Sequence, residues 1–233
     1  MTSRRIEKLV DDWVHIPETS SIVNVRDLGG WTNSRGETIQ YGKFFRGTEL
    51  NGDKYNINDA DKSVLYNDLG IRAELDLRTH AQAHSISSSP LGSDVSYLRV
   101  VNEPYYLDGA RSAFANYRSD FNYILENLRA NKPVYFHCIW GADRTGTLAF
   151  LLEGMLGLSE SDLYKEYEIT KLSDPEGDVR TQYYLVPLMD YIKTFDGNTL
   201  QEKFINYWHQ HVHIPMTDIN DFCQIMLGTT TQA

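Results

Sequence analysis

The sequence predicts an α/β fold in which helices flank a mostly parallel β-sheet and a helical part completes the C-terminus. The sheet is indicated by short apolar runs such as Val-Tyr-Phe at 134–136, because strands that are apolar on both sides are typical of a sheet covered on both faces. Segments with helical spacing of their apolar residues alternate with these runs, and after about residue 172 only helical segments follow. Alternation of strands and helices favours a parallel sheet.

The first strands are expected on either side of a long hairpin loop. Residues 22–25 form a strand-like run that ends at the turn 27–30, and residues 43–46 form a second run. The segment 32–42 between them is rich in Gly, Asn and Ser, which predicts the loop. Further β-type runs lie at 71–77, 95–101 and 134–136.

The helices are predicted by their caps and by their apolar spacing. Asn58 can cap a helix over 58–68, since aspartates follow in the first turn. Apolar residues three and four apart predict a helix within 111–131. Residues 145–158 are apolar nearly all round, which indicates a buried central helix, and a serine followed three residues later by an aspartate caps 159–172. Other helical segments are expected at 4–13 and in three pieces within 180–227, the last beginning at Thr217 and Asp218.

The composition argues against several classes of protein. The chain has 233 residues, of which 41% are hydrophobic, and it shows neither a linker nor a repeat, so we expect one domain over 1–233. Its formal net charge of −10 opposes nucleic acid or an anionic membrane as the main partner. No apolar run approaches the roughly 18 residues of a membrane span, and charges replace the apolar centre of a signal peptide. We therefore expect a cytoplasmic protein without stable membrane insertion, and the sequence leaves its oligomeric state open.

The stretch HCIWGADRTG at 137–146 occupies the turn between the predicted strand 134–136 and the predicted helix 145–158. Gly141 gives this turn conformational freedom. Successive amide groups in such a turn can point inward and form a concave anion site, which the start of the following helix reinforces. Arg144 can hold two phosphate oxygens in a bidentate fork. We therefore predict a phosphate-binding loop made of Ile139, Trp140, Gly141, Ala142, Asp143 and Arg144.

Cys138 lies at the base of this predicted loop, where amides and a helix terminus favour the nucleophilic thiolate. The hypothesis is that Cys138 attacks phosphorus and forms a phosphocysteine, which activated water then hydrolyses. Thr145 is expected to donate a hydrogen bond to the sulfur, and His137 to orient the loop. Arg144 and the amides hold the charge of the phosphoryl group, so the reaction needs neither a metal nor another cofactor. The histidines at 209, 211 and 213 are expected at the surface rather than on a metal.

The spacing of Cys138 and Arg144 alone is weak evidence, because an arginine falls six residues after a cysteine by chance in roughly one such chain in ten. The preceding histidine, the turn glycine and Arg-Thr-Gly at the start of a helix make the stretch specific. HCIWGADRTG resembles the active-site loop of protein tyrosine phosphatases, including dual-specificity and lipid-directed members. It is most similar to a bacterial tyrosine-phosphatase-like family whose loop ends in Asp-Arg-Thr-Gly.

Other stretches stand in the same order in that bacterial family: NVRDLGG at 24–30, GKFFRGTEL at 42–50 and ELDLRT at 74–79. The resemblance covers about residues 20–228. It implies the three-layer tyrosine phosphatase fold, with Cys138 as nucleophile and Arg144 as phosphate binder. It also implies a phosphorylated protein or a small phosphomonoester as the substrate partner.

The general acid has two candidates. Ordinary tyrosine phosphatases supply an aspartate from a separate mobile loop, beside Trp and Pro, and this chain has no such tripeptide. Asp143 matches an aspartate that is a candidate acid within the loop of the resembling family, although it could instead hold loop amides as a structural residue. Asp108, on the segment that follows the predicted strand 95–101, is the second candidate. We favour Asp143.

The substrate is expected to be phosphotyrosine. Many members of the resembling family carry a lysine where this chain has Ala142, and its absence lowers the expectation for phosphoinositides or inositol phosphates. Trp140 and Ile139 give the rim an apolar character that suits an aromatic leaving group, although Trp140 could equally pack against a neighbouring loop. A phosphoinositide or inositol phosphate phosphatase remains the alternative. A non-catalytic binding module is less favoured, because such relatives usually lose Cys or Arg.

Several charged residues are expected near the loop. Arg26 and Asp27 either form an ion pair beside it or are structural, and for Asp27 a purely structural role in the turn is favoured. Arg46 and Arg78 end strands, where they either flank the pocket or are solvated charges. Asp76 is expected to be structural, and the second cysteine, Cys223, is expected to be a small buried apolar residue.

Overall fold

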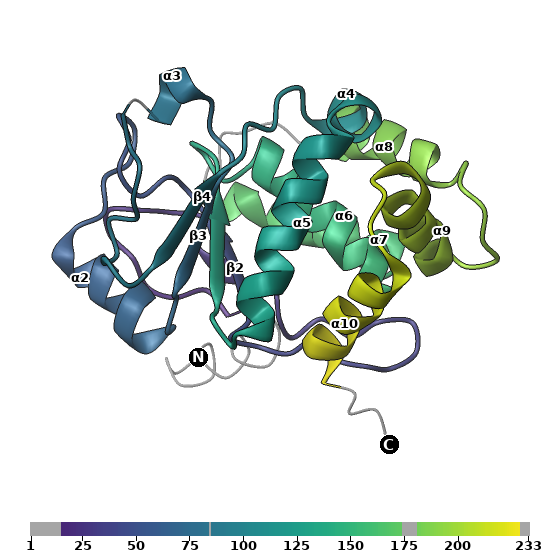
Figure 1. Cartoon of the computed structure of the whole chain (residues 1–233), viewed down its shortest axis with the longest axis horizontal. Coiled ribbons are helices and arrows are strands. Elements are labelled where there is room, and N and C mark those ends of the chain that lie inside the picture. Colours follow the sequence, from purple (N-terminus) through teal and green to yellow (C-terminus); the bar gives the residue numbers. More distant parts are fainter. Residues whose placement is uncertain (1–14, 84, 174–180, 229–233) are drawn as a thin grey trace.

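A five-stranded sheet in the order β1-β2-β5-β3-β4 organises the chain in a computed structural model that describes residues 15–83, 85–173 and 181–228 (Figure 1). β1 pairs antiparallel with β2, and the other neighbours in the sheet pair in parallel, which confirms the predicted mostly parallel arrangement. The strands are β1 (Arg26–Asp27), β2 (Phe44–Gly47), β3 (Ala73–Asp76), β4 (Ser96–Arg99) and β5 (Val134–His137).

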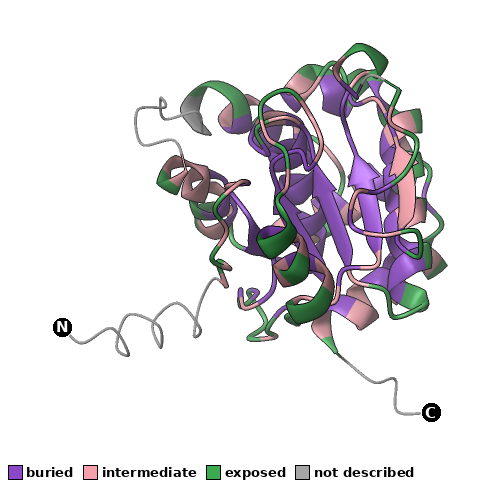
Figure 2. Cartoon of the chain, turned by 90° about the vertical axis from the view of Figure 1, so that its left-hand side faces the viewer, coloured by how far each residue is buried: buried purple, intermediate pink, exposed green. Residues whose placement is uncertain are grey.

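Successive strand side chains alternate between two apolar layers, one on each face of the sheet. Phe44 and Phe136 belong to the larger core, with their rings stacked 4.4 Å apart. Phe45 and Tyr135, one position along each strand, belong to the smaller core. Figure 1 shows the long helices α5 and α6 on one side of the sheet and α2 on the other. The inner strands β2, β5 and β3 are therefore buried at every position, whereas the edge strand β4 is only partly buried, a difference that Figure 2 shows by colour.

The helical elements follow the predicted order. α6 is buried at almost every position, which confirms the predicted central helix, and it begins two residues earlier than expected. Asn58 caps α2 and Ser159 caps α7, as predicted. The elements are α2 (Asp59–Ser63), η1 (Val64–Asp68), α3 (His80–Ala83), α4 (Tyr106–Ser112), α5 (Phe114–Arg129), α6 (Asp143–Leu156), α7 (Glu160–Glu168), η2 (Ile169–Leu172), η3 (Thr181–Leu185), α8 (Val186–Ile192), α9 (Leu200–Asn206), η4 (Tyr207–His211) and α10 (Met216–Leu227).

One of the predicted strands is wrong in its placement. The strand predicted at 22–25 is not formed, and β1 begins only at Arg26. Asn24 has a φ of 60°, which a β-strand cannot contain. The helix predicted within 111–131 is confirmed by α5, and only the first residues of that range belong to the separate helix α4, which ends before Ala113. The hairpin loop at 32–42 is confirmed by an antiparallel bridge between Thr32 and Thr38, whereas the helix predicted at 4–13 lies outside the described residues.

The sheet places the loop 137–146 between two other chain segments. Gly47 at the end of β2 and Asp76 at the end of β3 both pair with His137 at the end of β5. Because the carboxyl ends of parallel strands meet at one edge of a sheet, the segments after β2 and β3 flank the loop that leads from β5 into α6. Over the part of the chain that is described, no helix has the length and apolar character needed to span a membrane.

Candidate functional site

The loop after β5 is held through its carbonyl groups, which accept hydrogen bonds from the surrounding structure. A trans peptide plane points the carbonyl of one residue and the amide of the next in opposite directions. The amides of 139–143 therefore face the inner side of the loop. Among the described residues, the amides of 139–142 donate to no backbone carbonyl. Three carbonyl groups accept from other segments: Ile139 O from Glu49 N (3.0 Å), Trp140 O from Asn24 Nδ2 (3.1 Å) and Gly141 O from Arg46 Nη2 (2.6 Å). At the two ends of the loop, the bonds are local: Cys138 O meets His137 Nδ1 (3.0 Å), and Ala142 O accepts from Gly146 N of α6 (2.8 Å).

Gly141 has the turn role that the sequence predicted. Its φ of 65° lies in the left-handed region that favours glycine. A Cβ atom at this position would lie 2.3 Å from the carbonyl oxygen of Gly47, so a side chain here would push the loop away from β2. Asn24 Nδ2 also donates to the Gly141 carbonyl at 3.0 Å, and this contact fixes the tightest part of the turn.

Cys138 and Arg144 lie at the two ends of the loop. Cys138 is a free cysteine and is 3% exposed. The Nη1 atom of Arg144, in the first turn of α6, donates to Gln82 Oε1 at 2.7 Å and lies 3.5 Å from Glu103 Oε1. Thr145 Oγ1 is buried and has no hydrogen-bond partner among the described residues, so the expected bond from Thr145 to the cysteine sulfur is not formed in this structure.

His137 bridges the sheet and the loop, as an orienting residue should. Its Nε2 atom lies 3.0 Å from Glu74 Oε1, while its Nδ1 atom meets the Cys138 carbonyl. Both ring nitrogens thus face acceptors, which suits a protonated ring. Although burial lowers the pKa of His137, the carboxylates of Asp76 and Glu74 outweigh it and raise that pKa above its ordinary value.

Asp143, the first residue of α6, accepts a short hydrogen bond from the hydroxyl of Tyr106. The Tyr106 and Tyr167 hydroxyls are 2.6 Å apart. Burial, together with Tyr167 and Asp143, raises the pKa of Tyr106, so its hydroxyl keeps its proton and stays a donor. Asp108 is exposed in α4 and lines a neighbouring cavity. Of the two candidate acids, only Asp143 belongs to the loop itself.

The predicted ion pair between Arg26 and Asp27 is wrong. Adjacent strand residues point to opposite faces of a sheet, so the two side chains diverge. Arg26 Nε instead lies 2.7 Å from one carboxylate oxygen of Glu166, and Arg46 Nη1 lies 2.7 Å from the other. Asp27 accepts from the amides of Gly29 and Gly42, which agrees with its expected turn role.

Glu166 of α7 therefore joins the two arginines into one buried cluster behind the loop. Burial raises the pKa of this carboxyl, but the two guanidinium groups outweigh it and the pKa is lowered. Burial, with a contribution from the neighbouring Arg46, lowers the pKa of Arg26 to about 10. Arg26 therefore remains charged at neutral pH, and Arg46 reaches the loop through its bond to the Gly141 carbonyl.

Glu153 of α6 borders the same cluster and is also buried. Neither of its carboxyl oxygens has a hydrogen-bond partner among the described residues. Burial and the charge of Glu166 raise its pKa well above the ordinary value, which favours its protonated form. The buried cluster of Arg26, Arg46, Glu166 and Glu153 thus sets two guanidinium groups against the paired carboxylate of Glu166 and a second carboxyl group whose charged form burial opposes.

A second buried arginine site lies on the other side of the loop. Arg78 pairs with Asp76 at 2.7 Å and with Glu49 at 3.0 Å. Burial raises the pKa of Asp76, but His137 and Arg78 outweigh it and bring it down to about 2, which supports the expected structural role. Of the two interpretations offered for Arg46 and Arg78, the solvated charge is wrong, because both side chains are fully buried.

Trp140 lies on the rim of the loop and is 47% exposed. Its ring meets Tyr55 edge-on at 5.9 Å, and Lys54 Nζ lies 4.5 Å from its centroid. Trp140 therefore packs against the loop after β2 while still facing solvent.

Cys223 is half-buried against the larger core, somewhat more exposed than expected. Within 15–83, 85–173 and 181–228, no group of three or more His, Cys, Asp or Glu side chains could hold a metal ion.

Sequence reasoning missed three of the residues that support the loop: Asn24, Glu153 and Glu166. Asn24 stands at the start of the stretch NVRDLGG, so a signal was present there without a role attached. No local pattern marks Glu153 or Glu166, because each lies in an ordinary helical segment and meets its partners only after folding.

The sequence was compared with protein families and with known proteins. The family described as the tyrosine phosphatase family matches residues 17–184. A protein of Cupriavidus necator, whose name marks it as a candidate tyrosine-protein phosphatase, is 26% identical over 168 residues, which are 63% of this chain and 60% of that protein. The chain thus spans less than two thirds of the length of this relative.

Two solved structures are similar in their chain trace. The core catalytic domain of the PP-IP phosphatase SIW14 from S. cerevisiae, in complex with citrate, is 13% identical with a TM-score of 0.45, covering 89% of this chain and 97% of that one. TpbA from P. aeruginosa is 15% identical with a TM-score of 0.49, covering 84% of this chain and 98% of that one.

Proposed function

The chain belongs to the tyrosine phosphatase family, and from this premise we propose that it is a cysteine-dependent phosphatase that hydrolyses phosphotyrosine and related phosphomonoesters. The observation that carries the proposal is the outward hydrogen bonding of the loop carbonyls, which turns successive amides inward between Cys138 and Arg144. A ring of inward amides with an adjacent guanidinium fits a phosphoryl dianion.

Substrate binding uses the loop amides and Arg144. The guanidinium is anchored through Nη1 to Gln82, and its remaining N–H groups are available for two oxygens of the phosphoryl group. The buried cluster behind the loop keeps Gly141 in place through Arg46. Because these donors are fixed before substrate arrives, they stabilise the transition state without a cost of rearrangement.

The first chemical step transfers the phosphoryl group to Cys138. The thiolate sulfur forms a bond to phosphorus as the phosphorus–oxygen bond of the ester breaks. The leaving oxygen takes a proton from Asp143, whose carboxyl group is oriented by the hydroxyl of Tyr106. In the second step a water molecule gives one of its own protons to the Asp143 carboxylate and attacks phosphorus, so that the thiolate leaves and inorganic phosphate is released.

The assignment of Asp143 rather than Asp108 as the acid is supported by position. Asp143 is adjacent to Arg144 at the start of α6, so a phosphoryl group held by Arg144 brings its leaving oxygen close to this carboxyl group. A general acid must lie within hydrogen-bond reach of the atom that it protonates. Asp108 is in a different helix and is exposed to solvent.

Phosphotyrosine is favoured by the rim of the loop. Trp140 presents an exposed aromatic ring there, and Ala142 adds no charge. Lys54 lies over the Trp140 ring and is the cation of this rim. An aromatic ring can pack on such a surface, whereas a substrate with several phosphates needs more cations than the rim offers.

The test is a substrate panel with matched cysteine variants. Nitrophenyl phosphate, phosphotyrosine and phosphoserine peptides, a phosphoinositide and an inositol phosphate are compared at equal concentration. We expect the highest kcat/KM on phosphotyrosine peptides, loss of turnover by roughly 10³-fold or more in Cys138→Ser, and retention in Cys223→Ser. Rapid quenching of the wild type with labelled substrate should trap a phosphocysteine.

Each outcome of this panel is informative. Activity that survives in a folded Cys138→Ser variant contradicts the nucleophile assignment. A clear preference for inositol phosphates or phosphoinositides keeps the mechanism and replaces the substrate. Phosphopeptide binding by the wild type without any turnover would make the protein a binding module instead.

A further inference from the structure

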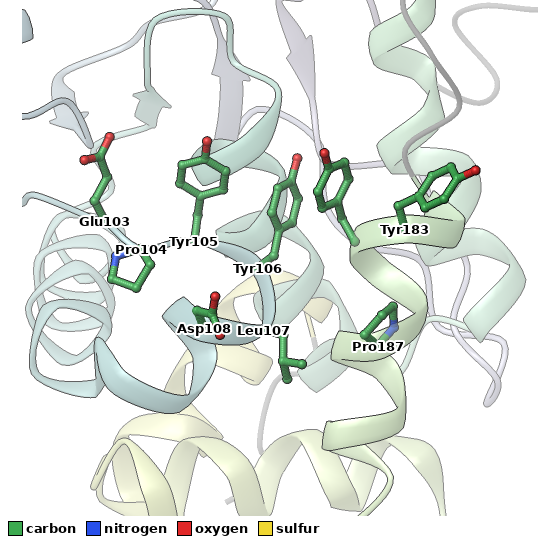
Figure 3. A pocket seen from close by; sticks show the side chains of 9 residues that line it. Glu103, Pro104, Tyr105, Tyr106, Leu107, Asp108, Tyr183 and Pro187 are labelled. Atoms are coloured by element: carbon green, nitrogen blue, oxygen red, sulfur yellow. The ribbon is translucent and has the colours of Figure 1, made fainter.

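A cavity of about 850 Å³ opens next to the candidate site, between the segment that precedes α4 and the helix η3. Figure 3 shows the rings of Tyr105, Tyr106 and Tyr183 in a row. The hydroxyls of Tyr105 and Tyr106 and the carboxylate of Glu103 point to the same side of that row, and Leu107 and Asp108 lie on the other. Tyr184 also lines the cavity, with its ring stacked on Tyr106 at 4.3 Å.

Two walls of this cavity contact the start of α6. The Tyr106 hydroxyl donates to Asp143, and the Glu103 carboxylate lies 3.5 Å from Arg144 Nη1. Under the proposed function, Asp143 protonates the leaving oxygen and Arg144 holds the phosphoryl group. The part of the substrate that departs with the leaving oxygen therefore lies on the side where the cavity opens.

The lining of the cavity has a distinct chemistry. It contains four tyrosines and the two carboxylates of Glu103 and Asp108, and its described lining residues include no Lys, Arg or His. Tyr183 is 74% exposed and Tyr184 43% exposed, so aromatic surface is presented to solvent. Electron-rich ring faces and carboxylates both attract an organic cation. A second anionic group in the same place would meet two like charges.

We propose that this cavity binds the leaving-group side of the substrate and selects a positively charged organic group there. The cation is either a basic side chain beside the phosphorylated residue of a peptide or the ammonium group of a small phosphomonoester. This inference rests on the proposed function, because it needs the phosphoryl group to be held by the adjacent loop. It adds a preference that the phosphate-binding loop cannot itself express, since every phosphomonoester presents the same group to the loop.

The experiment compares substrates that differ only in charge. One arm uses phosphotyrosine peptides with Lys, Ala or Glu at the positions flanking the phosphotyrosine. The other arm compares phosphoethanolamine with phosphoglycerate. We expect kcat/KM to be about three- to tenfold higher for the Lys peptide than for the Glu peptide, in line with ion pairs near the surface, and the ratio to fall with added salt. The arm with the larger ratio identifies the source of the cation.

Charge variants assign the preference to the cavity. In a Glu103→Gln, Asp108→Asn double variant the Lys to Glu ratio should fall toward one. Asp108→Asn alone should lower it part of the way, and this change does not alter the Arg144 contact made by Glu103. The matched control is Glu126→Gln, because Glu126 is an exposed carboxylate on α5 outside the cavity lining. The control should keep the wild-type ratio.

Two variants of Tyr183 test whether its aromatic ring contributes to the preference for a cation. Tyr183→Leu should lower the Lys to Glu ratio, and Tyr183→Phe should retain it, because a cation interacts with the ring face rather than with the hydroxyl. Equal kcat/KM for the cationic and anionic substrates in both arms, or a ratio that survives in the double variant, overturns the inference. If nitrophenyl phosphate is not hydrolysed at all, the proposed function fails instead, so the two failures are distinguishable.

Discussion

Asn24 offers the sharpest test of how the candidate loop is held. Its side chain is buried, and Nδ2 donates to the carbonyls of Trp140 at 3.1 Å and Gly141 at 3.0 Å. Its Oδ1 atom accepts from Arg26. The φ of 60° at Asn24 also makes two substitutions informative. Asn24→Gly removes the side chain and leaves the backbone at positive φ unstrained, whereas Asn24→Ala removes the side chain and adds backbone strain.

The magnitudes follow from these contacts. Each net hydrogen bond contributes about 1 kcal/mol, so loss of the two bonds to the loop weakens its tether by about 2 kcal/mol. Ala in the left-handed region costs about 1 kcal/mol more than Gly. Both variants should therefore be less stable than the wild type, Asn24→Ala more so than Asn24→Gly. Misaligned amides stabilise the transition state less, and we expect kcat/KM to fall roughly 10- to 100-fold in both.

The assay combines urea unfolding with the kinetics of nitrophenyl phosphate hydrolysis and the inhibition constant of inorganic phosphate. Asn131 provides the control, since it also has a positive φ of 54° but accepts from Lys43 in a surface contact away from the loop. Asn131→Gly should leave kinetics and phosphate inhibition unchanged. If folded Asn24→Gly has wild-type kcat/KM and the wild-type inhibition constant, the tether does not orient the amides and the reasoning is refuted.

Three further variants address the acid, its orientation and the buried cluster. Asp143→Asn should slow an alkyl phosphate far more than nitrophenyl phosphate, because a poor leaving group needs the proton more; a larger selective loss in Asp108→Asn would reverse the assignment. Tyr106→Phe should reduce turnover of the alkyl phosphate about tenfold. Tyr164→Phe, in α7, serves as its control. If Tyr106→Phe slows the alkyl phosphate and nitrophenyl phosphate equally, Tyr106 has a purely structural role. The raised pKa of Glu153 means that the folded state binds its proton more tightly than the unfolded state, so this group destabilises the fold increasingly as pH rises above its ordinary value of 4.5. The free energy of unfolding of Glu153→Gln should therefore rise relative to that of the wild type as pH increases above about 5, and a pH-independent difference in urea unfolding would contradict this.

The loop after β5 was predictable because its determinants are local. A short apolar strand, a glycine in the turn and a helix that begins at Arg-Thr-Gly lie within about a dozen residues. The backbone of such a segment has few alternatives, since Gly141 alone can take the required φ with no Cβ to meet Gly47. The middle of the central sheet was predictable for the same reason, because β5 and the start of β2 are short apolar runs.

The partners of the charged residues were not predictable from local pattern. Arg26 has an acidic neighbour in Asp27, and proximity in sequence suggested a pair. The pleat of β1 separates their side chains, and the packing of α7 brings in Glu166 from 140 residues away. The contact of Asn24 with Trp140 likewise spans 116 residues. Sequence spacing carries no information about such contacts until the sheet order is known.

The formal net charge of −10 makes an anion site in this protein a matter of local arrangement. In the buried cluster of Arg26, Arg46, Glu166 and Glu153, two guanidinium groups share the one carboxylate of Glu166, while burial raises the pKa of Glu153 and so opposes a second negative charge. Water and salt screen a buried charge much less than an exposed one, so the acidic surface does not cancel it. Arg46 also donates a hydrogen bond to the Gly141 carbonyl. This bond polarises the peptide group between Gly141 and Ala142 and makes its amide, on the inner side of the loop, a stronger donor. The charge behind the loop and the amides in front of it thus act in the same direction on an anion.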